Sequence, residues 1–159
     1  MPECFPRLWR FCAALTGQRD LADDLAQMTC LRAIEKAEHF TPGTHLDRWL
    51  FVMARRLWLN EIRKNSIRQS AGFVPTEEVD VEDKKPSTET NILAREVFNK
   101  IQSLPEAQRV TALLVFVEGY KYAEAAEILD VPAGTIMSRI SAARKTLAAQ
   151  MEAATGTDG

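Results

Sequence analysis

The beginning of the chain carries apolar residues at the three- and four-residue intervals of an amphipathic helix. Leu8, Phe11, Cys12 and Leu15 follow this spacing, and Gly17 directly after them is a typical helix stop. Nowhere along the chain do apolar and polar residues alternate in the way that indicates a strand. The pattern therefore predicts an all-α protein whose first helix ends at Gly17.

A second helix is predicted from Leu21 to Ala37, with Leu25, Met28 and Leu31 on one side of it. Proline and glycine interrupt the pattern in the segment 40–45, which we expect to be a loop.

A third helix is predicted from Asp47, whose carboxylate can cap its first turn, to about Lys64. Its inner stripe is expected to include Leu50, Met53, Leu57 and Ile62.

The second half of the chain also reads as helical. Pro105 precedes one candidate helix and Gly119 follows it, which is the asymmetry typical of helix termini. The four predicted helices are Asn91–Ser103, Glu106–Glu118, Tyr122–Leu129 and Ala133–Gln150.

Between these halves, the segment 71–90 is rich in Pro, Glu, Asp and Lys and has no helical periodicity. This composition predicts a flexible acidic linker. We therefore expect two small helical domains, 1–70 and 91–150, with a disordered tail at 151–159.

The composition narrows the class of protein. Of 159 residues, 46% are hydrophobic and 26% are charged, as is ordinary for a globular protein. No apolar run is long enough to span a bilayer and no signal peptide is evident, so we expect a cytoplasmic protein without membrane insertion. The residue pattern offers no catalytic triad, phosphate loop or metal cluster, and three cysteines without a Cys-x-x-Cys pair favour ordinary thiols. We expect no enzyme activity, no cofactor and no small-molecule substrate.

The charge is distributed unevenly, although the net charge is only −2. The segment 48–68 carries six basic residues against the single acid Glu61, and the segment 131–151 carries three basic residues and no acid. The acids gather instead in the segment 77–83. Two basic surfaces on either side of an acidic connector indicate contact with nucleic acid at two places.

Residues 122–140 have the pattern of a helix-turn-helix motif. Asp130 occupies the turn position and tolerates left-handed backbone geometry. The second helix of such a motif enters the major groove of DNA. Arg139 is placed to read a guanine edge, and Arg144 and Lys145 to contact phosphates. The predicted DNA-binding residues of this helix are Thr135, Ser138, Arg139, Ser141, Arg144 and Lys145.

Several longer segments resemble conserved regions of the extracytoplasmic-function (ECF) sigma factors. Residues 104–109 (Leu-Pro-Glu-Ala-Gln-Arg), 117–129 and 131–147 resemble the fourth region of that family. Residues 23–27 (Asp-Asp-Leu-Ala-Gln) and 47–55 (Asp-Arg-Trp-Leu-Phe-Val-Met-Ala-Arg) are similar to its polymerase-binding and promoter-melting helices. The resemblance spans nearly the whole chain in the order of the family.

The resemblance implies a role for each domain. The domain 1–70 would bind the clamp helices of core RNA polymerase, open the promoter −10 element and hold an unstacked base, and the domain 91–150 would read the −35 element. The implied polymerase-binding residues are Asp24, Gln27 and Arg32. The implied −10 DNA-binding residues are Phe40, His45, Arg48, Arg55 and Arg56. Trp49 and Trp58 are expected in the core. Met28, Cys30 and Arg56 depart from the residues common in the family.

The resemblance also implies partners: core RNA polymerase, promoter DNA and an anti-sigma factor. Two other functions share parts of the pattern. A sigma mimic would titrate an anti-sigma factor without touching DNA, but three basic residues on the predicted recognition helix argue against it. An ordinary helix-turn-helix regulator would lack the polymerase-binding block.

Overall fold

A computed structural model describes residues 4–68 and 89–156 of the chain. All regular structure in these residues is helical, as predicted, and the chain divides into two compact units, one in each half. The predicted linker 71–90 and the last residues of the predicted tail lie mostly or wholly outside the described residues, with only the end of the linker segment inside them. Each unit is described by itself.

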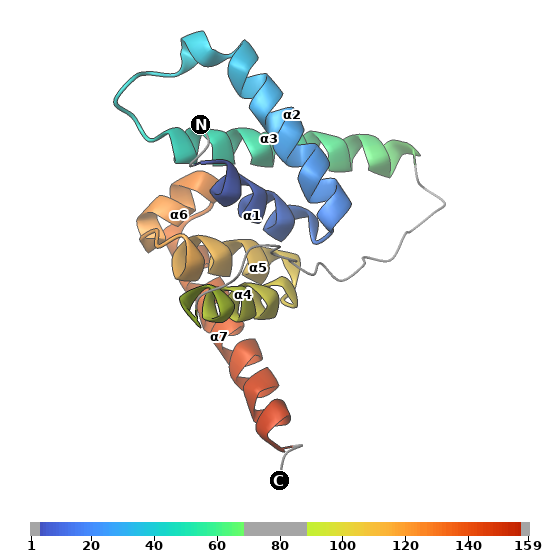
Figure 1. Ribbon diagram of the computed structural model, residues 1–159, viewed down its shortest axis with the longest axis vertical. Coiled ribbons are helices and arrows are strands. Elements are labelled where there is room, and N and C mark those ends of the chain that lie inside the picture. Colours follow the sequence, from blue (N-terminus) through green and yellow to red (C-terminus); the bar gives the residue numbers. More distant parts are fainter. Residues whose placement is uncertain (1–3, 69–88, 157–159) are drawn as a thin grey trace. The chain divides into compact units, whose positions relative to one another are not determined.

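Unit 1 consists of three α-helices and a short 3₁₀ turn (Figure 1). They are α1 (Phe5–Thr16), α2 (Arg19–Glu35), η1 (Ala37–His39) and α3 (Leu46–Arg68). Gly17 ends α1 in the left-handed conformation, with φ of 71°, which glycine adopts without steric cost. The first helix therefore stops where its sequence predicts.

The core of unit 1 forms where α1 packs against both α2 and α3. The rings of Phe11 and Phe51 stack at its centre, with centroids 4.7 Å apart. Arg7 of α1 forms an ion pair with Asp47 at 3.1 Å. Asp47 lies inside the first turn of α3, so the helix begins two residues earlier than a cap at Asp47 would require.

The side of α2 that faces the core is lined mainly by small residues. Ala22, Ala26, Thr29 and Ala33 are buried and recur at helical spacing. Small side chains let neighbouring helices approach closely; among the large apolar residues of α2, Leu25 is buried with them and others are turned outward. The large exposed ones are Met28, Leu31 and Ile34.

This arrangement corrects part of the predicted core. Of the three residues expected to share one side of α2, Leu25 is buried, whereas Met28 is 39% and Leu31 is 61% exposed. On α3, Leu50 is buried as predicted, but Ile62 is 40% exposed. The prediction was wrong at Met28 and Leu31 because α2 packs against the core mainly through small residues, and it was also wrong at Ile62 on α3.

Unit 2 consists of four α-helices and one π-helical turn. They are α4 (Glu89–Gln102), α5 (Glu106–Ala112), η2 (Leu113–Val117), α6 (Tyr122–Leu129) and α7 (Ala133–Gly156). Helix α7 is the long helix of the unit and packs against α5 and α6 (Figure 1).

Two boundaries in unit 2 differ from the prediction. The single helix expected over Glu106–Glu118 changes at Leu113 into a π turn, marked by the hydrogen bond from Glu118 N–H to the Leu113 carbonyl at 3.0 Å. The final helix continues past Gln150 to Gly156, so residues 151–156 are helical rather than disordered.

Candidate nucleic-acid interfaces

The turn between α6 and α7 has the geometry of a helix-turn-helix motif. Asp130 adopts the left-handed conformation predicted for it, with φ of 54° and ψ of 50°. The Val131 N–H donates to the Ala126 carbonyl at 3.0 Å, which satisfies a carbonyl left open at the end of α6. At the start of α6, the Lys121 N–H donates to the Glu124 carboxylate at 2.9 Å. Both ends of the short first helix are therefore held by hydrogen bonds.

Helix α7 has one buried side and one outer side. Ile136, Ile140 and Ala143 are buried against the rest of unit 2. The six predicted −35 residues all lie outside this stripe. Ser138, Ser141, Arg144 and Lys145 are exposed, and Thr135 and Arg139 are partly exposed. The structure thus leaves every predicted recognition residue accessible on one helix.

The two arginines of this set lie on different flanks of α7. Arg139 and Arg144 are five residues apart, which places them roughly 140° apart around an α-helix. Lys145 lies between them on the outer side. The Arg144 guanidinium carbon lies 5.7 Å from the centroid of the Phe116 ring, within cation–π range. Phe116 belongs to η2 and had no role in the sequence-based prediction.

One further exposed residue on α7 escaped the sequence pattern. Met137 is 58% exposed and adjoins the predicted DNA-binding residue Ser138. Methionine gives no sequence signal for exposure, because it is a flexible apolar residue that commonly fills protein cores. Its exposure becomes visible only when the buried stripe of α7 is known.

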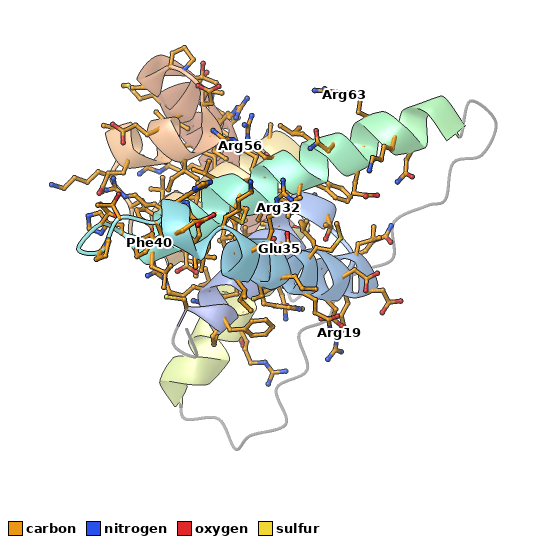
Figure 2. All side chains as sticks on the ribbon, turned by 90° about the horizontal axis from the view of Figure 1, so that it is seen from above. Arg19, Arg32, Glu35, Phe40, Arg56 and Arg63 are labelled. Carbon is orange, nitrogen blue, oxygen red and sulfur yellow. The ribbon has the colours of Figure 1, made fainter. Side chains whose placement is uncertain are left out.

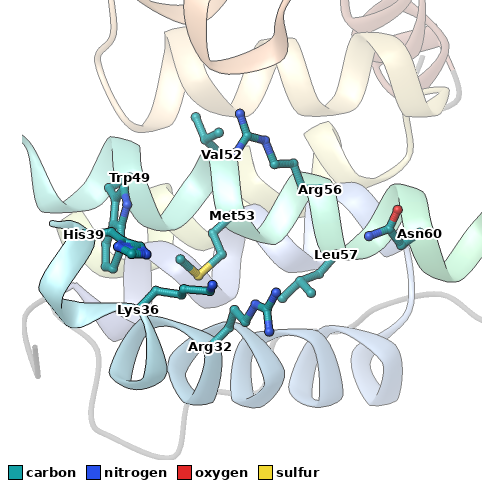
Figure 3. Close-up of a pocket in the computed structure, with 9 residues that line it drawn as sticks. All are labelled: Arg32, Lys36, His39, Trp49, Val52, Met53, Arg56, Leu57 and Asn60. Carbon is teal, nitrogen blue, oxygen red and sulfur yellow. The ribbon is translucent and has the colours of Figure 1, made fainter.

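Unit 1 contains a pocket between α2, η1 and α3 (Figure 3). Its volume is about 360 Å³. One side of the pocket is formed by α2 and η1, with Arg32, Lys36 and His39 (Figure 3). The other side is formed by α3, with Met53 and Leu57. The complete lining is Arg32, Lys36, His39, Trp49, Val52, Met53, Arg56, Leu57 and Asn60.

The chemistry of this pocket suits a nucleotide. Arg32, Lys36 and Arg56 supply positive charge at neutral pH, and Trp49 supplies an aromatic ring. Cations attract phosphates, and aromatic rings stack on unpaired bases. Lys36 and His39 were missed by sequence reasoning, because Lys36 follows the last residue of α2 and His39 lies in η1, so no single helix face connects them to Arg32.

The predicted −10 residues are only partly brought together. Arg56 lines the pocket, whereas Phe40, His45, Arg48 and Arg55 are not part of its lining. Phe40 packs against the pocket residue Trp49, with ring centroids 5.2 Å apart and planes tilted by 44°.

The remaining −10 candidates differ in how exposed their side chains are. His45 is exposed in the loop before α3, and Arg48 and Arg55 are partly exposed on α3. Trp49 and Trp58, expected in the core, are only partly buried. The −10 candidates therefore divide into a group at the pocket and a group on other parts of α3 and its loop.

The predicted polymerase-binding residues are also divided. Asp24 and Gln27 are exposed on α2 outside the pocket, whereas Arg32 lines the pocket and pairs with Glu35 at 3.5 Å (Figure 2). The adjacent Asp23 accepts a hydrogen bond of 2.6 Å from the Trp9 indole, which ties it to α1. Leu31 and Ile34 add exposed apolar surface to the face of Asp24 and Gln27.

Two family models match the chain, one in each unit. Residues 3–67 match "Sigma-70 region 2", and residues 94–147 match "Sigma-70, region 4". A helical unit that matches region 2, followed by a unit with a helix-turn-helix motif that matches region 4, defines the class of the sigma-70 transcription initiation factors.

Curated relatives narrow the class to a family. The chain is 34% identical to ECF RNA polymerase sigma factor EcfG of Rhodopseudomonas palustris, over 91% of this chain and 78% of the relative. It is 35% identical to ECF RNA polymerase sigma factor SigC of Mycobacterium tuberculosis, over 91% and 77%. The chain belongs to the ECF RNA polymerase sigma factors. It is therefore a transcription initiation factor, which binds core RNA polymerase and promoter DNA, and not an enzyme.

Solved structures show the same fold. The sigma factor RpoE, in complex with the anti-sigma factor NepR from Bartonella quintana, aligns with a TM-score of 0.76 and 27% identity, covering 95% of this chain and 93% of that one. CnrH, in complex with the cytosolic domain of CnrY, aligns with a TM-score of 0.57 and 22% identity, covering 92% and 80%. Among the residues described for this chain, no helix combines the length and hydropathy needed to cross a bilayer.

Proposed function

We propose that the two units divide promoter recognition between single-stranded and duplex DNA. In unit 1, the pocket between α2 and α3 takes a base that leaves the stack when the −10 element opens. The observation that carries this proposal is the pocket itself, in which Trp49 and Met53 offer an apolar wall beside Arg32, Lys36 and Arg56. Phe40 supports Trp49 from the loop side. Arg48 and Arg55 contact the DNA backbone along α3, and His45 contacts it from the loop.

In unit 2, the outer side of α7 reads the −35 element as a duplex. Ser138 and Ser141 are short, so the helix backbone can approach the base edges, and Thr135 lies near the helix N-terminus. Arg139 reads a guanine, and Arg144 and Lys145 contact phosphates. Base readout and phosphate contact are thereby assigned to different residues of one helix.

The exposed face of α2 binds core polymerase. Asp24 and Gln27 supply polar contacts, and the neighbouring Leu31 and Ile34 supply apolar ones. Leu31 is 61% and Ile34 is 69% exposed, and large apolar side chains on a helix surface are typical of protein interfaces. Arg32, which also lines the pocket, contributes a further polar contact to core polymerase.

An anti-sigma factor keeps the protein inactive until a signal releases it. The support comes from RpoE, which resembles this chain in both halves and is bound by NepR. The protein acts in the cytoplasm, where core polymerase and the chromosome are found.

Transcription in a reconstituted system tests the division of roles. Core polymerase with the purified protein is expected to give a run-off product from a subset of genomic fragments, and core alone is not. Leu31→Asp is expected to weaken core binding at least tenfold, as for a residue central to an interface. Leu59→Asp, on α3 and 39% exposed, is the matched control and should bind core normally.

Two results would contradict the proposal. If the protein bound an anti-sigma factor tightly but never associated with core polymerase, it would be a sigma mimic. If Leu31→Asp and Leu59→Asp weakened core binding equally, the polymerase interface would not be centred on α2.

A further inference from the structure

Phe116 is a large aromatic residue that the fold leaves 38% exposed. It lies in η2, where the chain changes from α5 into a π turn. The hydrogen bond from Glu118 N–H to the Leu113 carbonyl spans five residues instead of four. A π turn therefore changes the directions of the side chains that follow Leu113 relative to a continued α-helix. Single π turns are uncommon and are found often at functional sites.

The ring of Phe116 lies against the guanidinium of Arg144, at 5.7 Å from centroid to carbon. Arg144 is exposed on α7 and is assigned above to a phosphate of the −35 duplex. An arginine side chain has many rotamers, and fixing one of them costs conformational entropy when DNA binds. A ring that holds the guanidinium in advance removes part of that cost.

We propose that Phe116 is a positioning residue for promoter recognition, which holds Arg144 at the flank of α7 where a duplex phosphate passes. The proposal rests on the function assigned to α7 above. The proposal adds Phe116, which lies in η2 and outside the helix-turn-helix motif, to the residues on which DNA recognition depends, through its contact with Arg144. Phe116 acts through Arg144 and need not touch DNA itself.

A double-mutant cycle tests this coupling. Holoenzyme with the wild-type protein first selects a duplex from a randomised pool, and affinity for that labelled duplex is then measured by fluorescence anisotropy over a range of salt concentrations. Arg144→Ala should reduce the slope of log affinity against log salt concentration by about one, because one phosphate contact is lost. Phe116→Ala should weaken binding about two- to fivefold, the range of an exposed cation–π contact. In the Arg144→Ala background, Phe116→Ala should have no further effect.

Two conservative variants separate positioning from stability. Phe116→Tyr keeps an aromatic face and should bind as wild type, whereas Phe116→Leu keeps apolar bulk without that face and should bind like Phe116→Ala. Val97→Ala, at a residue that is 40% exposed in the same unit, controls for the loss of exposed apolar surface and should bind normally.

Different failures have different meanings. If Phe116→Ala weakened binding equally with and without Arg144, or if Arg144→Ala had no effect, the positioning role would be overturned. If the wild-type holoenzyme selected no duplex, or if Arg139→Glu selected as well as wild type, the function assigned to α7 would fail instead.

Discussion

The pocket of unit 1 and the outer side of α7 in unit 2 both present cations, but their shapes are opposite. The pocket is concave, and its aromatic ring and apolar wall are as prominent as its charges. The outer side of α7 is convex, and the short side chains of Ser138 and Ser141 lie between its basic residues. A base can enter a pocket only after it has left the stack, whereas a slim helix fits the groove of intact duplex. Surface shape, more than charge, therefore indicates which form of DNA each unit binds.

The largest expected effect comes from reversing a charge on the convex surface. Arg139→Glu should weaken binding to the −35 duplex by about 100-fold, because a bidentate base contact is lost and an acid faces phosphates. Filter binding with holoenzyme measures this loss. Lys100→Glu, which is exposed on α4 of the same unit, is the matched control. Core binding, and transcription from a pre-melted promoter, should be unchanged in both variants; a shared loss would mean that the two units do not act separately.

A smaller effect is expected when the aromatic wall of the pocket is removed. Trp49→Ala should slow promoter opening about tenfold, which is the typical contribution of one base–aromatic stack, while Trp49→Phe should retain most activity. The fluorescence of 2-aminopurine placed in the −10 element reports opening. Trp58→Ala changes another partly buried tryptophan of α3 that lies outside the pocket lining. Equal slowing by Trp58→Ala would indicate a loss of stability and not of stacking.

A third prediction concerns Met137 on the convex surface. Its exposed thioether is suited to contact with the C5-methyl group of a thymine in the major groove. Replacing the contacted thymine with uracil should weaken wild-type binding about fourfold, since one buried methyl group is worth about 0.8 kcal/mol. The same replacement should leave Met137→Ala unaffected. If no thymine of the selected duplex shows this dependence, Met137 does not take part in readout.

The last prediction concerns stability instead of DNA binding, and it distinguishes the two units at alkaline pH. Burial raises the pKa of the Cys12 thiol well above its ordinary value of 9.0, and the nearby Cys30 adds to the shift. Below pH 9 both folded and unfolded chains keep the proton, so stability does not depend on it. Above pH 9 the unfolded chain releases the proton and the folded chain does not, so unit 1 should lose up to about 1.4 kcal/mol per pH unit.

Chemical denaturation at several alkaline pH values checks this loss. The Cys12→Ala variant should lack that part of the pH dependence, although it is less stable at every pH because a buried side chain is truncated. Unit 2 contains no cysteine, so its unfolding should show no such contribution. An identical pH profile in Cys12→Ala would exclude the thiol as the cause.

Sequence reasoning worked best where one residue decides the local backbone. Gly17 and Asp130 predicted a helix end and a left-handed turn, and both have that conformation. The buried residues Ile136 and Ile140 of α7 are likewise four residues apart, which is the spacing of one helix face. In each case the cause lies within a few residues of the feature, so it can be read without tertiary structure.

Features that depend on several helices could not be read in this way. The pocket combines residues of α2, η1 and α3. The sequence assigned Arg32 to polymerase contact, Arg56 to −10 DNA contact, and the other lining residues to core packing or to no role. The outward position of Leu31 follows from small residues on the opposite side of α2, such as Ala26. The π turn at Leu113 gave no sequence signal, because its residues are as apolar as those of an ordinary helix.

The positive φ of Asp130 also limits what can occupy that position. A residue branched at its β-carbon would be strained in this conformation, whereas glycine and asparagine adopt it readily. In a library randomised at codon 130 and selected for transcription, survivors should therefore be confined to aspartate, asparagine and glycine. Each of the latter two is one nucleotide substitution away from an aspartate codon, so random mutation can reach every tolerated version of this turn directly.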